Sequence, residues 1–140
     1  MPIKPENRDR YPDNWKQIRE RILARAGNCC EQCRVPNGVT VLRGMASDKG
    51  RYQMPDGVVR DAENGGLVCL RPFEFLGTPV KIVLTVAHLD HTPENCADDN
   101  LKALCQWHHL RYDAKHHAET ARQTRRAKLA IGDLFATNED

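Results

Sequence analysis

The sequence has 140 residues, of which 29% are charged and 6% aromatic, and its formal net charge is +2. This length fits one domain or a small core with appendages, and the few aromatic residues predict a modest hydrophobic core. The small net charge does not by itself indicate a nucleic-acid partner, and no apolar run approaches a membrane span, so no membrane association is expected.

The first third of the chain predicts one helix followed by a cysteine turn. Residues 1–12 are polar and proline-rich, which predicts a mobile arm. Residues 13–26 carry apolar side chains at helical spacing, so we expect an amphipathic helix there. Its buried stripe would consist of Trp15, Ile18, Ile22 and Leu23. Gly27 is a typical residue at a helix end, and Cys30-Glu-Gln-Cys33 follows directly.

Further strands and helices are expected around a long insertion. Residues 44–78 are rich in Gly, Asp and charge in their first part, which predicts an irregular insertion with one short strand at 67–70. The β-branched run at 80–87 predicts a single buried strand. The remaining expected elements are a strand at 39–42, helices at 98–110 and 114–129, and a C-terminal tail at 131–140.

Six cysteines without an apolar segment near Met1 predict metal ligands and free thiols rather than disulfides, and a cytoplasmic location. The spare apolar thiols would be Cys69 and Cys96.

Four residues offer a tetrahedral structural zinc site: Cys30, Cys33, Cys105 and His108. A Cys-x2-Cys turn supplies two sulfurs, and the other two ligands are three residues apart on an expected helix, so they share a face. The two pairs would join the first helix to the later one. Two alternatives stay open: His109, four residues after Cys105, shares the same face, and Cys29 competes with Cys30.

A second set of polar residues surrounds the later pair in the sequence: His88, Asp90, His91, Asn100 and His109. Hydrolysis of a phosphodiester requires a deprotonated water, stabilised charge on phosphorus and a neutralised leaving oxygen. One divalent cation and one histidine can supply all three. A structural zinc beside an open metal site is therefore typical of a metal-dependent hydrolase.

These motifs resemble the HNH endonucleases, whose ββα-metal (His-Me finger) core is a β-hairpin followed by a helix. Val86-Ala-His-Leu89 matches the first histidine, Asp99-Asn-Leu101 the asparagine, and Cys105-Gln-Trp-His-His109 the last histidine beside a zinc ligand. Residues 11–37 also resemble small bacterial and prophage members, and the resemblance covers 11–37 and 79–118. It implies an α+β fold with a ββα-metal core, a structural zinc knuckle and flanking helices, in a nuclease domain at 13–130.

The resemblance assigns catalytic roles to His88, Asn100 and His109. His88 would be the general base, and Asn100 would hold the loop through its amide, with metal ligation or plain helix capping as alternatives. His109 would bind a catalytic Mg²⁺, Mn²⁺ or Ni²⁺ with help from Asp90 and His91.

This chain departs from the family pattern at two positions. The family has a carboxylate before the first histidine, where this chain has Ala87, and a second Cys-x2-Cys, where this chain has Cys-x2-His. If the strand continued beyond His88, Asp90 would lie on the same face and could replace the missing carboxylate. In an alternative register, Asp90 is the ligand and His91 the base.

The sequence thus predicts a metal-dependent DNA endonuclease in the cytoplasm of a bacterial host cell. A zinc-stabilised nucleic-acid-binding module with weakened catalysis is the alternative, and a zinc-ribbon adaptor is a third reading. The expected phosphate contacts are Arg111, Lys115, Arg122, Arg125 and Arg126. Through the resemblance, DNA and phage packaging proteins are the expected partners, whereas the oligomeric state is left open.

Overall fold

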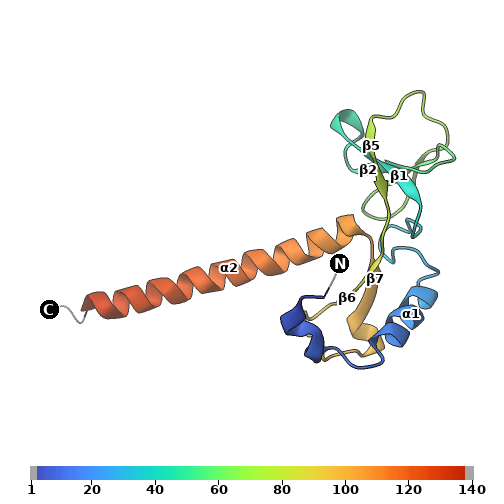
Figure 1. Ribbon diagram of the computed structural model, residues 1–140. Helices are drawn as coiled ribbons and strands as arrows, with labels where there is room; N and C mark the ends of the chain where they lie inside the picture. Colours follow the sequence, from blue (N-terminus) through green and yellow to red (C-terminus); the bar gives the residue numbers. More distant parts are fainter. Residues whose placement is uncertain (1–2, 138–140) are drawn as a thin grey trace. The chain divides into compact units, whose positions relative to one another are not determined.

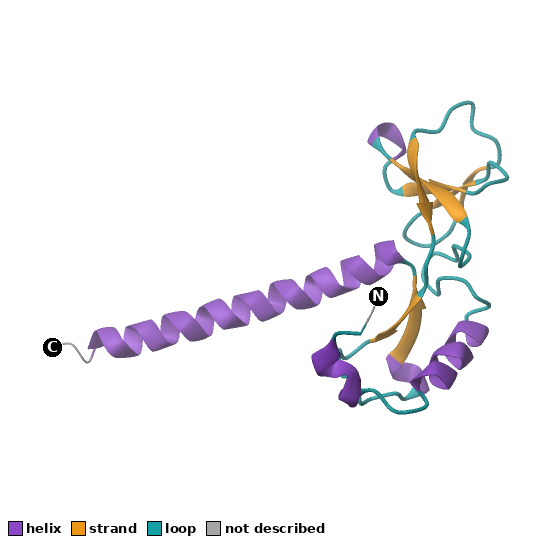
Figure 2. Cartoon of the chain, viewed as in Figure 1, coloured by secondary structure: helices purple, strands orange, loops and turns teal. Residues whose placement is uncertain are grey.

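The computed structural model describes residues 3–137, with side chains through residue 132, as a mixed α+β chain (Figures 1 and 2). The chain divides into two units, one ending at His109 and one beginning at Leu110. The helices are η1 (Pro5–Arg10), α1 (Trp15–Arg25), η2 (Ala46–Asp48), η3 (Asp98–Asn100) and α2 (Gln106–Thr137), where η denotes a 3-10 helix. The strands are β1 (Thr40–Gly44), β2 (Arg51–Gln53), β3 (Val59–Asp61), β4 (Leu67–Cys69), β5 (Gly77–Lys81), β6 (Thr85–His88) and β7 (Leu101–Leu104).

One hydrophobic core of the first unit lies between α1 and the antiparallel pair β6–β7. Ile18 and Ile22 are four residues apart on α1, so they share a face, and both are buried against Val86 and Ala103. Val86 and Ala103 are themselves paired across the two strands. The expected helix is confirmed, and the rest of its apolar stripe, Trp15 and Leu23, is partly buried against the same cluster.

A five-stranded antiparallel sheet forms the other part of this unit, with the strand order β4-β3-β2-β1-β5. The strand expected at 67–70 is present as β4, but the segment 44–78 is not otherwise irregular throughout, because it also contains β2, β3 and the start of β5. Three of these strands have only three residues, which is too short for an alternating pattern to stand out. Pro79 fits because β5 is an edge strand.

The expected helix at 98–110 is wrong in its first half. Residues Leu101–Leu104 form strand β7, whose Leu101, Ala103 and Leu104 side chains are all buried. Tertiary burial therefore overrides the capping signal of Asp98 and Asp99, which form only a 3-10 turn. The helical parts expected at 98–110 and 114–129 are one continuous helix, α2.

The apolar run at 80–87 is not a single strand. It contributes to β5 in the larger sheet and to β6 in the pair with β7. Between these two strands, Ile82 and Leu84 are almost fully buried. The backbone N–H of Ile82 donates to the Val39 carbonyl, and the backbone N–H of Leu84 donates to Oδ1 of Asn37. A change of sheet leaves no break in an apolar run, so sequence periodicity cannot reveal it.

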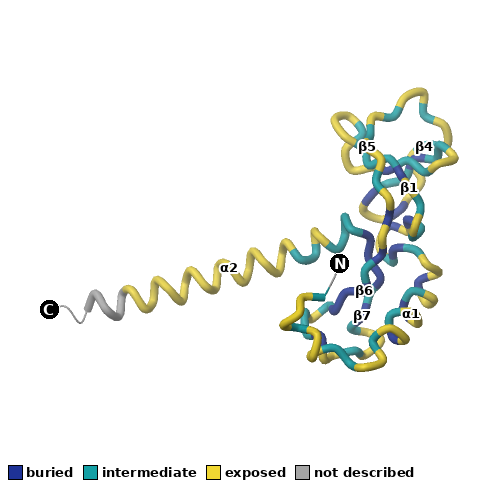
Figure 3. The backbone as a smooth tube through the Cα atoms, viewed as in Figure 1, coloured by how far each residue is buried: buried dark blue, intermediate teal, exposed yellow. Residues whose placement is uncertain are grey.

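The second unit consists of the greater part of α2, with exposed side chains from residue 114 to residue 132 (Figure 3). Within the described part of the chain, no helix has both the length and the apolar character that a membrane span requires. Residues 138–140 of the expected C-terminal tail lie outside the described residues.

Substitution of Ile22, which is 1% exposed at the contact between α1 and the strands, tests this core. We expect Ile22→Ala to lower the free energy of unfolding by about 2–5 kcal/mol, because it leaves a cavity in a small core. Urea denaturation measures the change. Glu20→Ala, at an exposed position of the same helix, should alter it by no more than about 0.5 kcal/mol.

Candidate metal centre and catalytic residues

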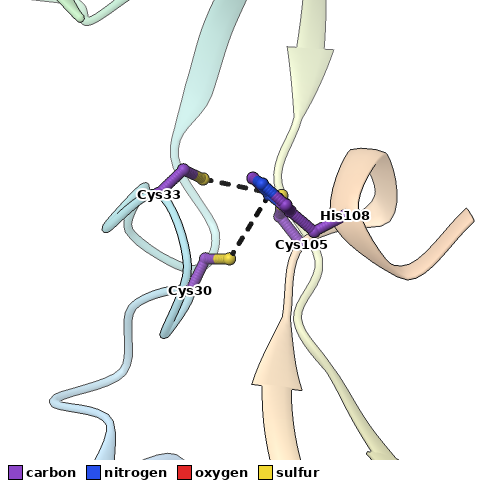
Figure 4. A group of neighbouring side chains, drawn as sticks. All are labelled: Cys30, Cys33, Cys105 and His108. Atoms are coloured by element: carbon purple, nitrogen blue, oxygen red, sulfur yellow. Dashed lines mark hydrogen bonds between the residues drawn. The ribbon is translucent and has the colours of Figure 1, made fainter. Parts of the chain in front are cut away.

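Four side chains from three chain segments converge at one point: Cys30, Cys33, Cys105 and His108 (Figure 4). Their ligand atoms all lie within 4.8 Å of one another, and the three cysteines are completely buried. Cys30 and Cys33 come from the turn that follows α1, Cys105 from the end of β7, and His108 from the first turn of α2. This cluster could hold a metal ion such as zinc.

Three separations between the ligand atoms are close to those of a tetrahedral zinc site. The sulfurs of Cys33 and Cys105 are 3.7 Å apart, and Nδ1 of His108 lies 3.4 Å from Cys105 Sγ and 3.9 Å from Cys30 Sγ. A zinc ion with Zn–S bonds of about 2.3 Å and a Zn–N bond of about 2.0 Å requires ligand separations of roughly 3.5–3.8 Å. These three separations are therefore compatible with a bound zinc ion.

The orientation of the His108 ring favours it as the fourth ligand. Its Nε2 lies 3.1 Å from the carbonyl oxygen of Glu63, so Nε2–H can donate there, and Nδ1 faces the sulfurs and is the nitrogen that would bind a metal once it is deprotonated. His109, one residue later, does not belong to the cluster, and neither does Cys29. Both alternative ligands are thus replaced by the set Cys30, Cys33, Cys105 and His108.

Proton sharing links the four groups. Hydrogen bonds from Cys105, and then from Cys33, lower the pKa of Cys30. Burial alone would lower the pKa of His108, but its contacts with Cys105 and Cys30 outweigh burial and raise that pKa to about 9. A metal that binds thiolates and a neutral imidazole would therefore release protons as it enters.

Three contacts from the five-stranded sheet support the cluster. Arg43 Nη2 donates to Cys105 Sγ at 3.4 Å, and the Arg43 guanidinium lies 5.5 Å from the centroid of the Tyr52 ring. The Tyr52 hydroxyl donates to the carbonyl of Cys33 at 2.8 Å. The turn before β4 comes so close that a Cβ on Gly65, which has φ +75°, would lie 2.3 Å from the Cys33 oxygen. No sequence signal marks these residues, because each acts through a backbone carbonyl or a distant sulfur.

His88 is the last residue of β6 and is only 8% exposed. Its ring stacks on Trp15 with centroids 5.0 Å apart and meets the edge of Tyr11 at 5.6 Å. Its Nε2 lies 3.6 Å from the sulfur of Cys96. Burial in this aromatic surrounding lowers the pKa of His88, which favours the neutral imidazole. Cys96, expected to be a spare thiol, thus contacts the predicted general base.

Asn100 and Asp90 hold the loop between β6 and β7 together. Asn100 Nδ2 donates to Asp90 Oδ1 at 2.9 Å and to the Asn95 carbonyl at 2.8 Å, and its Oδ1 accepts from the Asp90 backbone at 3.2 Å. Asp90 also accepts from Asn95 Nδ2 and from the backbone of Thr92. These hydrogen bonds, that from Asn95 first, lower the pKa of Asp90 to about 2. The amide of Asn100 thus joins both ends of the loop by hydrogen bonds, while its catalytic role stays a prediction.

The condition for Asp90 to share a strand face with His88 is not met. β6 ends at His88, and the chain turns at once, with the His91 backbone N–H donating to the His88 carbonyl at 3.0 Å. His91 adopts φ +57°, a left-handed conformation typical of tight turns. Asp90 is therefore a loop residue whose carboxylate is engaged by neighbouring amides.

Among the side chains that the structure describes, which end at residue 132, the cysteine and His108 cluster is the one group of three or more His, Cys, Asp or Glu residues that could share a metal ion. The predicted second set, in which His109 would bind a catalytic cation with Asp90 and His91, does not form such a group. The expected phosphate contacts are all exposed on α2: Arg111, Lys115, Arg122, Arg125 and Arg126. Their role in DNA binding stays a prediction.

Comparisons with protein-family models, with curated proteins and with solved structures found no match to this chain. The resemblance of its motifs to HNH endonucleases therefore stays an expectation from the sequence.

Adjacent cysteines provide a matched test of the metal centre. We expect the protein to bind one zinc ion, and Cys30→Ser to abolish stoichiometric binding and lower thermal stability, because metal binding energy is folding energy. Cys29→Ser should keep both, since Cys29 lies outside the cluster. Elemental analysis of purified protein and thermal unfolding with and without a chelator measure these effects. Folded wild-type protein without zinc would contradict the assignment.

Substitution of Arg43 tests the support from the sheet. Three thiolates around Zn²⁺ leave a net negative charge, which the guanidinium next to Cys105 Sγ offsets. We expect Arg43→Met to weaken zinc binding about 10- to 100-fold, as is usual for groups that contact metal ligands. Competition with a chromophoric chelator measures the affinity. Arg51→Met, on the exposed surface of the same sheet, should leave it unchanged.

Proposed function

We propose that this chain is a zinc-stabilised, metal-dependent DNA endonuclease of the HNH type. The observation that carries the proposal is the order of elements around three residues. His88 ends β6, Asn100 directly precedes β7, and His109 lies in the first turn of α2. An antiparallel strand pair followed by a helix, with these side chains at these points, is what the family's ββα-metal core requires.

The cysteine cluster would serve the active site by fixing the start of α2. His108 directs Nδ1 to the sulfurs, and consecutive helical residues are rotated by about 100°, so His109 leaves the helix in another direction. A zinc ion would therefore hold the start of the helix without using His109 as a ligand, and His109 would bind the second cation. In this way a structural metal would support a catalytic one without sharing ligands.

The environment of His88 suits a general base. A base must be neutral to accept a proton from water, and burial beside Trp15 lowers the pKa of this imidazole. The catalytic cation would stabilise the charge on the phosphate and the leaving oxygen. Its protein ligands would be few, because Ala87 replaces the family's carboxylate and Asp90 is engaged in the loop. Ni²⁺, which favours imidazole ligands, is then expected to support activity better than Mg²⁺.

The same facts about Ala87 and Asp90 favour a second candidate function, a zinc-stabilised nucleic-acid-binding module that cuts weakly or not at all. Such a module needs the metal cluster and the basic surface of α2, but not His88. Cleavage assays separate the two functions, because only the nuclease depends on that histidine.

Substitution of His88 is the direct test. We expect His88→Ala to reduce plasmid nicking with Ni²⁺, Mn²⁺ or Mg²⁺ by about two to four orders of magnitude, the usual contribution of a general base. DNA binding and zinc content should be retained. In the wild type, cleavage should fall with decreasing pH only below the ordinary histidine pKa of 6.5, because burial lowers the pKa of His88 and the base is lost only when it is protonated.

His91→Ala is the comparison variant for this test, since His91 lies three residues later, in the loop after β6, and is the base of the alternative register. It should retain cleavage. An inactive His91→Ala with an active His88→Ala would assign the base to the alternative register. A wild-type protein that binds DNA but cuts with none of the three metals would instead establish the binding module.

A further inference from the structure

A groove of about 400 Å³ lies next to β6, on the side where the N-terminal segment meets α1. Its walls include the rings of Tyr11 and Trp15, the guanidinium of Arg19, and the apolar side chains of Val83 and Leu84. Val83 is 49% exposed, so apolar surface on this wall is open to solvent. The volume is in the range of small-ligand sites.

The chemistry of these walls fits a nucleobase. A base has a polar edge and two apolar faces, and these faces stack on aromatic rings. The phosphate of the same nucleotide attracts a guanidinium. Tyr11 and Trp15 supply the rings, with centroids 5.2 Å apart in an edge-on arrangement. Arg19 Nη2 contacts the Leu84 carbonyl at 3.4 Å, which holds the guanidinium at the groove wall, and its fork has further N–H donors.

The groove adjoins the predicted general base. Trp15 lines the groove and stacks on the His88 ring at an interplanar angle of 23°, and Tyr11 contacts both rings. A ligand in the groove would therefore lie one aromatic ring away from the residue proposed to activate water. This continuity favours part of the nucleic-acid substrate over an unrelated ligand.

We propose that this groove binds an unstacked base from a single-stranded stretch of the substrate, next to the bond that is cut. Bases within a duplex are stacked on both faces and cannot enter such a groove, whereas single strands and distorted junctions present them freely. The inference rests on the proposed function, and it makes the enzyme a nuclease that favours single-stranded or frayed DNA. We expect little difference in affinity among the four bases, because every base has a face that can stack on an aromatic ring.

The test compares two ligands on the zinc-loaded wild-type protein without added catalytic metal. One is a labelled oligodeoxythymidine of about eight nucleotides, and the other is an abasic strand of equal length. By fluorescence anisotropy, we expect the base-bearing strand to bind about 10- to 100-fold more tightly, as base stacking on aromatic side chains predicts. Equal affinities would overturn the inference, because only phosphate contacts would then contribute.

Variants locate the effect in the groove. Tyr11→Leu should remove most of the difference between the two strands, whereas Arg19→Gln should weaken both strands alike, since it removes a phosphate contact. Arg21→Gln, on the same helix but outside the groove, is the matched control and should change neither. A full base-dependent difference in Tyr11→Leu would also overturn the assignment.

The outcome is independent of cleavage. Protein that nicks plasmid but binds both strands equally retains the proposed function and loses this inference. Protein that prefers the base-bearing strand but cuts no DNA with any metal retains the groove and loses the nuclease.

Discussion

The convergence of Cys30, Cys33, Cys105 and His108 is the constraint on which the first unit depends. Cys33 and Cys105 are 72 residues apart, yet their sulfurs lie 3.7 Å from each other. Closing a loop of that length costs conformational entropy, and the small core between α1 and the strands has few large side chains to offset it. Four ligands that share one metal ion can supply the missing free energy, because the ion binds them only when the chain is folded.

The cluster also explains why the five-stranded sheet belongs to this unit. The Tyr52 hydroxyl contacts the cysteine turn, and the Glu63 carbonyl contacts the His108 ring. Arg43 contacts the sulfur of Cys105. The sheet thus fixes the rotation of His108 and balances charge at the sulfurs, while the cysteine turn docks on β7 through a backbone bond from Glu31 to Ala103. Removing the insertion would leave the ligands present but poorly oriented, which is the usual consequence of losing groups that position metal ligands.

The parts of this arrangement that the sequence could predict are those with local signals. The apolar spacing of α1 and the short Cys-x2-Cys interval each depend on residues that are close together in the sequence. Sequence patterns therefore predict both the helix and the cysteine pair. Strand β7 was not predicted, because Asp98 and Asp99 imitate a helix cap while the burial of Leu101 and Ala103 is decided by α1. Arg43, Tyr52 and Glu63 were equally hidden, since their contacts to cluster residues lie 19 to 62 residues away in the sequence and leave no pattern in a single sequence.

The surroundings of His88 bear on how a site without the family's carboxylate could work. A carboxylate beside the base would help to hold a cation, but it would also raise the pKa of a neighbouring imidazole. With Ala87 at that position and Asp90 tied to amides, His88 is instead enclosed by aromatic rings that favour its neutral form. In the proposed nuclease, a lower affinity for the cation would then be accompanied by a base that stays unprotonated at lower pH, because burial lowers the pKa of His88. Weak cation binding and an effective base would thus be compatible in the same site.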